Sequence, residues 1–221
     1  MNAREKILEA ADELFGELGF DAATTREIAE RSGVNKALIH YHFQSKEELL
    51  EAVLDRYYER LREVVEKALE KPGDARQRLA RLVDAYVDFL SRNRNFSRIV
   101  QRESSGGPRQ KRIQGHLEPM FKLAVDMLHH EFPATRKGTT EAHQLLVSFY
   151  GVIVTYFTYS EILGGLIDKD PLSPRELAKR KRHLHWMLDV VLDAVEDKEA
   201  CGRSKGGGRR QKAKERRGKG A

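Results

Sequence analysis

The sequence predicts an all-α fold of about nine helices, in which an N-terminal three-helix unit precedes a larger C-terminal helical bundle. A 40% share of hydrophobic residues, with 33% charged residues and only six prolines, is typical of a soluble helical protein. The alternation of apolar and polar residues that indicates strands is nearly absent. Four capping side chains instead stand three residues before a Glu, a pattern that marks helix starts, and they are Asn2, Thr24, Ser45 and Ser173.

Apolar residues at helical spacing, bounded by glycine and proline, place the individual helices. We expect them at about 3–18, 25–32, 36–43, 46–70, 74–92, 95–103, 110–131, 140–164 and 174–197. Pro119 lies inside the seventh helix and should kink or divide it, because proline removes one helical hydrogen bond. The helix at 46–70 is too long for the N-terminal unit alone, so we expect it to run on into the bundle.

The basic charge of the chain is concentrated in its tail. The net charge is +6 overall, but residues 202–221 alone carry +8 and the first 50 residues carry −4. The tail holds six glycines and almost no apolar residues, which predicts disorder. Two interpretations of it stay open: a salt-dependent tether for DNA or RNA, or a solvated end without a role.

Several protein classes are disfavoured by the sequence. A lone cysteine, Cys201, allows no internal disulfide, and the N-terminus lacks the apolar core of a signal peptide, so we expect a cytoplasmic protein. The 17 uncharged residues at 144–160 are fewer than the roughly 20 apolar residues of a membrane span, and they predict a buried helix. Phosphate loops, metalloprotease motifs and nucleophile elbows are missing, so we expect neither an enzyme nor a cofactor. His116, His129, His130 and His143 have no spacing that puts two of them on one helix face, so we expect no metal site.

The segment from Thr24 to Leu50 predicts a helix-turn-helix. Ala29 is small enough for two helices to cross closely, and Gly33 can adopt the positive φ of a tight turn. Val34 and Ile39 should pack the second helix onto the first, with Asn35 as its N-cap. An ordinary helical hairpin would share this spacing.

The outward residues of the second helix favour DNA binding over a plain hairpin. Lys36, Ala37, His40 and Tyr41 fall opposite the packing side, and Leu38 is placed to meet a thymine methyl group. His42 and Lys46 lie where the chain would pass a phosphate, and Thr24 and Thr25 stand at a helix N-terminus that suits one. Because this unit is net acidic, its DNA contacts should be few and specifically placed.

This segment resembles the TetR family of bacterial one-component repressors over about residues 6–52. The matching residues are Gly19-Phe20, Thr24-Thr25, Ile28-Ala29, Gly33-Val34, Lys36, Ile39, Tyr41-His42-Phe43 and Ser45 to Leu49. The resemblance implies a homodimer that binds double-stranded DNA at a palindromic operator and responds to a small-molecule effector. It implies a DNA-binding domain at 1–47, a ligand-binding and dimerisation domain at 48–198, and a basic tail at 199–221.

The resemblance also implies individual contacts with DNA. Phosphate contacts fall to Thr25, Tyr41, His42 and Lys46, and base or groove contacts to Lys36, Ala37, Leu38 and His40. Two positions depart from the family pattern: His40 stands where Tyr is usual, and Leu38 where a small or polar residue is usual. Both departures should change which operator sequence is read.

The predictions for the C-terminal half rest on its apolar helices. The eighth helix is apolar nearly all round and so should be covered on all sides. With the ninth helix it would form a four-helix dimer interface, as the resemblance implies, through Val147, Val154, Leu184, Met187 and Val191. Candidate ligand-binding residues are Phe89, Phe96, Phe121, Phe149, Tyr150, Tyr156 and Phe157, with Arg102 and His116 for an acidic group. For each aromatic residue, a place in the core is the simpler alternative.

The function that the sequence favours is a DNA-binding transcriptional repressor that a small, mainly apolar ligand releases from its operator. The alternative is an architectural DNA-binding protein whose affinity comes from the basic tail.

Overall fold

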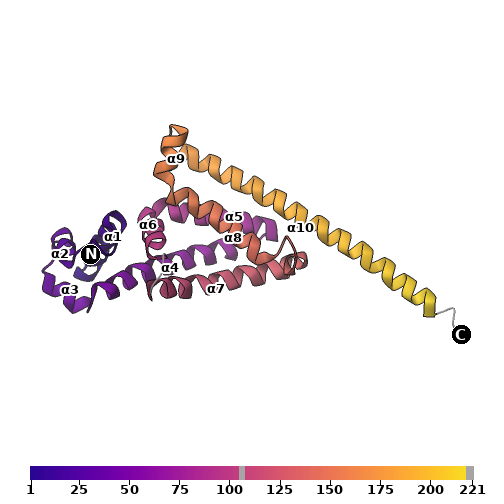
Figure 1. The fold of residues 1–221 in the computed structure, drawn as a ribbon, viewed down its shortest axis with the longest axis horizontal. Coiled ribbons are helices and arrows are strands. Elements are labelled where there is room, and N and C mark those ends of the chain that lie inside the picture. Colours follow the sequence, from indigo (N-terminus) through magenta and orange to yellow (C-terminus); the bar gives the residue numbers. More distant parts are fainter. Residues whose placement is uncertain (105–107, 218–221) are drawn as a thin grey trace.

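The computed structural model describes residues 1–104 and 108–217, with side chains for 1–104 and 109–200, and over this part it is all-α (Figure 1). The elements are α1 (Ala3–Leu18), α2 (Thr25–Ser32), α3 (Lys36–His42), α4 (Lys46–Glu70), α5 (Ala75–Arg92), α6 (Arg94–Glu103), α7 (Pro108–Glu131), the 3-10 helix η1 (Pro133–Arg136), α8 (Ala142–Thr158), α9 (Ser160–Ile167) and α10 (Pro174–Arg217). The all-α prediction is confirmed.

Local sequence signals set the starts of the N-terminal helices. The Asn2 side chain accepts the Glu5 backbone N–H at 2.9 Å, and the Glu5 carboxylate accepts the Asn2 N–H at 3.0 Å, which completes a capping box. Ser45 caps α4 by accepting the Glu48 N–H at 3.1 Å. These caps satisfy backbone donors that a helix start leaves without partners, so the predicted boundaries are confirmed there.

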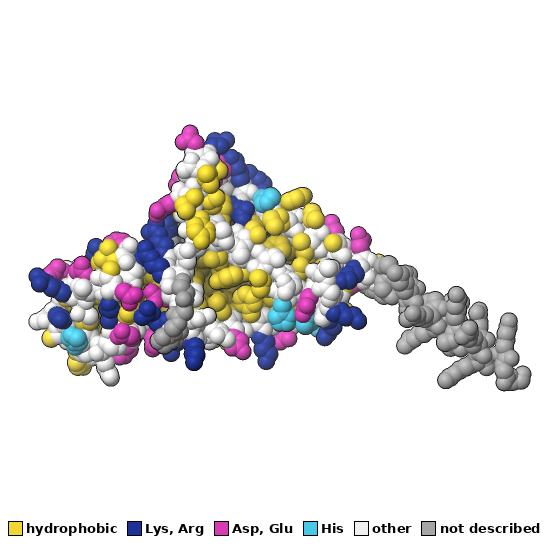
Figure 2. Space-filling view, viewed as in Figure 1, with side chains coloured by type: hydrophobic (Ala, Val, Ile, Leu, Met, Phe, Trp, Pro, Cys, Tyr) yellow, Lys and Arg dark blue, Asp and Glu magenta, His cyan; other side chains and the backbone are white. Residues whose placement is uncertain are grey.

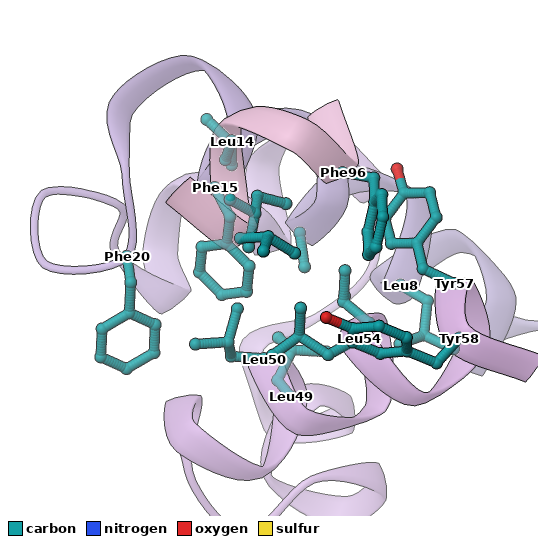
Figure 3. Packing of buried hydrophobic residues seen from close by; sticks show 14 of the residues in the cluster. Leu8, Leu14, Phe15, Phe20, Leu49, Leu50, Leu54, Tyr57, Tyr58 and Phe96 are labelled. Atoms are coloured by element: carbon teal, nitrogen blue, oxygen red, sulfur yellow. The ribbon is translucent and has the colours of Figure 1, made fainter. Parts of the chain in front are cut away.

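One hydrophobic core joins the N-terminal unit to the bundle. Helices α1, α2 and α3 gather at one end of the molecule, and α4 runs from them along the bundle beside α7 (Figure 1). Figure 3 shows Leu14 and Phe15 of α1 beside Leu49, Leu50 and Leu54 of α4, with Tyr57, Tyr58 and Phe96 further along the same cluster. The helix that starts at Lys46 therefore links the two parts through continuous packing, as the sequence predicts.

A second, smaller core lies at the far end of the bundle. Val125 and Leu128 of α7 pack there with Ala142 of α8 and with Leu188 and Leu192 of α10. The first half of the long helix α10 is held there mainly against α5 and η1. Arg76 of α5 adds ion pairs to Asp189 and Asp193 of α10, at 3.1 and 2.8 Å.

The prediction of one continuous eighth helix at 140–164 is wrong. The structure has two helices there, α8 and α9, bent by 75° at Tyr159. No glycine or proline marks the bend. Ile153 and Phe157 of α8 are buried in the core, whereas Ile162 and Leu166 of α9 are exposed.

The seventh and last predicted helices can also be compared with the structure. Of the two outcomes predicted for Pro119, division of the helix is wrong, because α7 is one helix from Pro108 to Glu131. Helix α10 continues to Arg217 and not to 197, so the backbone of the tail is helical where disorder was predicted. Residues 209–217 are good helix formers, and extending an existing helix adds a hydrogen bond per residue.

Candidate DNA-binding surface and ligand cavity

The turn between α2 and α3 has the geometry that the sequence predicts. Gly33 adopts a left-handed conformation with φ 66° and ψ 26°, which a residue with a side chain rarely adopts. The Val34 N–H donates to the Ala29 carbonyl at 3.2 Å and closes the turn. Ile28 and Ile39 are buried beneath it, so α3 is fixed against α2 and projects outward. This is the helix-turn-helix arrangement that can enter a major groove.

The outer face of α3 is exposed and its residues are open to DNA. Lys36, Ala37, Leu38, His40 and Tyr41 are all exposed, and Tyr41 is 81% exposed. No ion pair in the described residues involves Lys36. The Asn35 side chain accepts the Ala37 N–H at 2.9 Å and sets the start of the helix. The sequence-predicted reading residues therefore lie together on one surface.

His42 lies at the edge of this surface and supports Tyr41. Its ring is half-buried and meets the ring of Tyr41 edge-on, with 5.1 Å between their centroids. Phe43, the next residue, is buried and anchors the end of α3. The arrangement holds the Tyr41 side chain outward, where its hydroxyl group can meet a phosphate.

The two threonines at the start of α2 have different surroundings. The Thr24 hydroxyl oxygen accepts the Glu27 N–H at 3.2 Å, and the Glu27 carboxylate accepts from the Thr24 N–H and hydroxyl group, both at 2.8 Å. These bonds hold the pKa of Glu27 below its ordinary value. Thr24 is thus occupied as a cap, and Thr25, half-buried at the first helical position, is the freer of the two for a phosphate.

Lys46 has a different role from the predicted phosphate contact. Its ammonium group donates to the backbone carbonyls of Phe20, Asp21 and Ala23, at 2.8, 3.4 and 2.9 Å. It also lies over the Phe20 ring, 4.4 Å from the centroid. An ammonium group has three donors, and here all three are used. Lys46 therefore clamps the α1–α2 loop to the start of α4, and that loop positions α2.

A cavity of about 210 Å³ lies between α5, α6 and α8. Its wall is mainly apolar and aromatic, with Tyr86 and Leu90 from α5, Phe96 and Val100 from α6, and Tyr150 and Val154 from α8. Ser97, Ser104, Thr155 and Thr158 add hydroxyl groups to the wall, and Gln101 adds an amide group. The lining residues that the structure describes carry no formal charge. Such a cavity suits a small, mainly apolar molecule.

A second hollow, of about 270 Å³, lies beside the α8–α9 bend and is polar. Arg94 and Arg98 of α6 and Lys169 line it together with Glu161 and Asp170. Arg98 forms an ion pair with Glu161, which ties α6 to α9.

Comparison with known proteins agrees with this geometry. Residues 7–53 match the family model described as "Bacterial regulatory proteins, tetR family". The uncharacterised HTH-type transcriptional regulator YvkB of Bacillus subtilis is 30% identical over 170 residues, which cover 76% of this chain and 87% of that protein. The chain belongs to the TetR family. It is a transcriptional regulator with a DNA-binding helix-turn-helix, and not an enzyme.

Two further comparisons show how far the likeness extends. The HTH-type transcriptional activator FasR of Mycolicibacterium smegmatis is 41% identical over 97 residues, 44% of each chain, so this match spans under half the length of that relative. A crystal structure of FadR from Bacillus subtilis in complex with stearoyl-CoA superposes with a TM-score of 0.67 at 19% identity, covering 83% of this chain and 96% of that one. That structural likeness shows that the shared fold extends over most of this chain and is not limited to the helix-turn-helix.

The predicted ligand residues divide into those that reach a cavity and those that do not. Phe96 and Tyr150 line the apolar cavity, and Phe157 lines the polar hollow. Phe89 packs behind Phe96 at 5.5 Å and Phe121 against Tyr150 at 5.8 Å, both between ring centroids. Phe149 packs against the second core, and the Tyr156 hydroxyl group donates to the Pro171 carbonyl at 2.7 Å.

Neither predicted acid-binding residue faces the apolar cavity. Arg102 donates instead to the carbonyls of Phe15 and Gly16 at the end of α1, at 3.3 and 3.2 Å. His116 stacks on Tyr58, and its Nε2 lies 2.9 Å from an Asp55 carboxylate oxygen. Both side chains are thus held by partners elsewhere in the protein, and the prediction that they bind an acidic ligand group is wrong for this cavity.

The sequence-based prediction missed Tyr86, Ser97 and Thr158 in the cavity wall. Ser97, Val100, Gln101 and Ser104 recur at helical spacing on one face of α6. That stripe of small and polar residues on an otherwise amphipathic helix is a signal that could have pointed to Ser97, whereas Tyr86 and Thr158 lie on α5 and α8.

An apolar face remains uncovered on α8, α9 and α10. Figure 2 shows hydrophobic side chains gathered over these helices. The exposed residues are Val147, Ile162, Leu166, Ile167, Trp186 and Val190. Of the predicted dimer residues, Val147 lies on this face and Met187 and Val191 are half-buried. Leu184 is wrong, because it is fully buried in the core of the chain itself, and Val154 lines the cavity.

No single helix in the described part of the chain is long and apolar enough to cross a membrane, and only the bent pair α8 and α9 reaches the length and composition together. Within the same residues, no group of three His, Cys, Asp or Glu side chains is placed to hold a metal ion.

Proposed function

We propose that this TetR-family protein is a dimeric repressor that binds a palindromic operator through α3 and releases it when a small, mainly apolar ligand enters the α5–α6–α8 cavity. Residues 1–47 serve as the DNA-binding domain and 48–198 as the ligand-binding and dimerisation domain. The observation that carries the proposal is the position of α6. One side of this helix lines the cavity, and the other side touches the DNA-binding unit.

The contact between α6 and α1 offers a direct route from ligand to DNA. Phe96, Ser97 and Val100 face the cavity, while Arg102 on the same helix holds two carbonyl groups of α1. A molecule that shifts α6 therefore shifts the support of the helix-turn-helix. The ligand acts only if it binds the two arrangements with different affinity.

The uncovered face of α8, α9 and α10 supports a second copy of this chain as the partner. Isologous contacts pair the same face of two copies, and a contiguous apolar face is the usual mark of such an interface. A dimer would place two α3 helices to read half-sites about 34–36 Å apart, one turn of DNA.

The names of relatives bear on the ligand and on the sign of regulation. A structure with the same fold is of a regulator in complex with stearoyl-CoA, whose acyl chain is apolar, and this supports an effector with an apolar part. A relative of the N-terminal half is named an activator. Repression is the mode that the family resemblance implies, and a reporter promoter with the operator placed over the transcription start site tests it: the purified ligand should raise expression.

Operator binding is tested first by selecting a site from random duplex DNA and measuring affinity by fluorescence anisotropy. Lys36→Ala should weaken binding by about 1–3 kcal/mol and relax the base preference at one position, whereas Tyr41→Ala should weaken binding to all related sites alike. Lys67→Ala removes an exposed cation at the far end of α4 and is the control. Unchanged affinity in both α3 variants would remove α3 from the DNA interface.

The rival function is architectural DNA binding through the basic tail. The structure describes no side chains there, and the tail's charge of +8 is its only support. A chain ending at 201 separates the two functions. The repressor keeps its operator preference and loses only part of its salt-dependent affinity, whereas an architectural protein loses DNA binding altogether.

A further inference from the structure

We propose that the part of the effector inside the cavity is uncharged and mainly apolar and carries a carbonyl group, and that the hydroxyl groups of Ser97 and Thr158 donate hydrogen bonds to its oxygen. This inference rests on the proposed function, because it concerns the same α5–α6–α8 cavity. It names the chemical class of the ligand and the two residues that recognise it.

The first observation is that two hydroxyl groups in the cavity wall are buried without partners. Ser97 is 4% exposed, and neither its Oγ nor the Oγ1 of Thr158 has a hydrogen-bond partner among the described residues. Buried polar atoms are nearly always hydrogen-bonded, and each exception calls for an explanation. A ligand that supplies the missing partner explains both exceptions at once.

Other serines of the same region show that this situation is not forced by the helix. A helical serine can donate back to a carbonyl group in the preceding turn. Ser104 does so to the Val100 carbonyl at 2.5 Å, and Ser91 to the Asp88 carbonyl at 2.8 Å. Ser104 lines the same cavity from the exposed C-cap of α6, whereas Ser97 is buried within the helix and lacks such a bond.

The second observation is the absence of charge in the described cavity wall. A buried carboxylate or phosphate needs a cation or several donors, and burying it without them is strongly unfavourable. Arg102 is bound to carbonyl groups of α1, and His116 is bound to Asp55. The cations Arg94 and Arg98 line the separate polar hollow. The part of the ligand inside this cavity is therefore neutral.

The number of donors suits a carbonyl oxygen. Each hydroxyl group has one hydrogen to donate, and a carbonyl oxygen has two lone pairs that can accept both. The remaining wall contains the polar Gln101 and Thr155, and its apolar part, formed by residues such as Leu90, Phe96 and Val154, favours an apolar body. The volume of about 210 Å³ is below the range of roughly 300–1,000 Å³ that is usual for drug-sized ligands, so a small ring or a short chain segment fits it.

Three probes of similar shape test the proposal on the full chain: acetophenone, ethylbenzene and benzoate. They differ at one position, which is a ketone, a methylene group or a carboxylate. Binding is measured by ligand-observed NMR and isothermal titration. We expect acetophenone to bind at least about fivefold more tightly than ethylbenzene, the effect of roughly one net hydrogen bond, and benzoate to bind most weakly.

Three variants assign that preference to the two hydroxyl groups. Ser97→Ala and Thr158→Val should each reduce the ratio of ethylbenzene to acetophenone dissociation constants, and together they should bring it to about one. Ser104→Ala is the matched control, because its hydroxyl group lines the cavity but already has a partner, and it should leave the ratio unchanged.

A second readout distinguishes recognition from structural support. Because the two hydroxyl groups are unpartnered without ligand, Ser97→Ala and Thr158→Val should keep or raise the Tm of the free protein. A structural hydroxyl group would lower it on removal. A lowered Tm in both variants, an unchanged ratio in both variants, equal binding of the three probes, or no binding of any probe would each overturn the proposal.

The proposed repressor function can fail separately. If acetophenone binds with the expected preference but no ligand changes operator affinity, the ligand class stands and the regulatory role falls. If an apolar hydrocarbon releases the operator as well as its ketone does, the role stands and the carbonyl proposal falls.

Discussion

The Tyr57 hydroxyl group on α4 donates a hydrogen bond to the Asp12 carboxylate on α1, its oxygen lying 2.5 Å from Oδ1 and 2.6 Å from Oδ2. Both side chains are largely buried, and the Arg56 guanidinium lies 3.7 Å from the same carboxylate. This bond ties the DNA-binding unit to the helix that enters the bundle. It is one of the places where the two parts of the protein hold each other in register.

Removing the Tyr57 hydroxyl group should destabilise the protein. Tyr57→Phe leaves the Asp12 carboxylate without its closest donor, at a cost of about 1.5–3 kcal/mol in the free energy of unfolding. The neighbouring Tyr58→Phe is the control, since the Tyr58 hydroxyl group is buried without a partner in the part of the chain that the structure describes, and its loss should not destabilise. Urea denaturation measures both, and equal losses would contradict the assigned role.

Asp12 should make stability depend on pH. Burial raises the pKa of Asp12 above its ordinary value of 3.8, against the opposing effects of the Tyr57 hydrogen bond and Arg56. The folded state thus binds the proton more tightly than the unfolded state, so Asp12 lowers stability at neutral pH. That penalty is relieved as the pH falls through the folded pKa towards 3.8.

The variant Asp12→Asn, measured by urea denaturation from pH 7 down to about pH 4, tests this sign. It should be more stable than the unmodified chain at pH 7, and the difference should shrink as the pH falls. Asp126→Asn changes an exposed carboxylate on α7 and should show no such trend. A variant that is less stable at pH 7 would mean that the Arg56 and Tyr57 interactions outweigh burial.

The sequence-based prediction succeeded for features set by residues close together in the sequence. It failed for features set by tertiary contacts. Gly33, Thr24 and Ser45 act on residues within four positions of themselves, so the helix-turn-helix and the helix starts could be read directly. Lys46 and Arg102 could not, because their partners are loop and helix-end carbonyls far away in sequence. The sequence shows that a lysine or arginine is present, but it does not show which acceptor groups its side chain will bind.

The sequence-based prediction of the α8–α10 region failed for a related reason. Both sides of these helices carry apolar residues, so the sequence does not say which side faces the chain's own core. Leu184 faces inward and Trp186 outward, because two positions on a helix place side chains on nearly opposite sides. The bend at Tyr159 was missed as well, because no glycine or proline marks it.

The contact of Gly16 with Asn95 should make the α1–α6 interface sensitive to a single methyl group. A Cβ at Gly16 would lie 2.5 Å from the Asn95 Cγ and 2.8 Å from its Cβ, so α6 itself must move away. We expect Gly16→Ala to lose about 1–3 kcal/mol of stability through overpacking, although alanine is favoured in helices by about 1 kcal/mol. The affinity of the Gly16→Ala variant for the operator should change together with its stability.

Gly115→Ala is the matched control for that helix-propensity effect. It lies on α7, and an added Cβ there would meet nothing within 4 Å. It should raise the free energy of unfolding by up to about 1 kcal/mol and leave operator affinity unchanged. If Gly16→Ala behaves in the same way, the α1–α6 contact is not a rigid one and the proposed route from ligand to DNA loses its support.

The loop clamp at Lys46 predicts a separation of stability from DNA affinity. Lys46→Met removes three hydrogen bonds to carbonyl groups and should lower the free energy of unfolding by about 1.5–3 kcal/mol. It should leave the salt dependence of operator binding unchanged. A phosphate contact would instead lower the slope of log affinity against log salt by about 1. Anisotropy titrations at several salt concentrations, beside urea denaturation, decide between the two roles.

The apolar face of α8, α9 and α10 should control assembly without controlling the fold. Leu166 is 76% exposed and Trp186 is 59% exposed, so Leu166→Glu and Trp186→Glu place a charge on the proposed interface and not in the core. Sedimentation velocity should show a folded monomer with unchanged helical circular dichroism. Leu18→Glu, at an exposed position of α1, should stay dimeric. Leu184→Ala should instead lose about 2–5 kcal/mol of stability, because it empties part of the core. Dimers that persist in both glutamate variants would show that another surface of the protein joins the two copies.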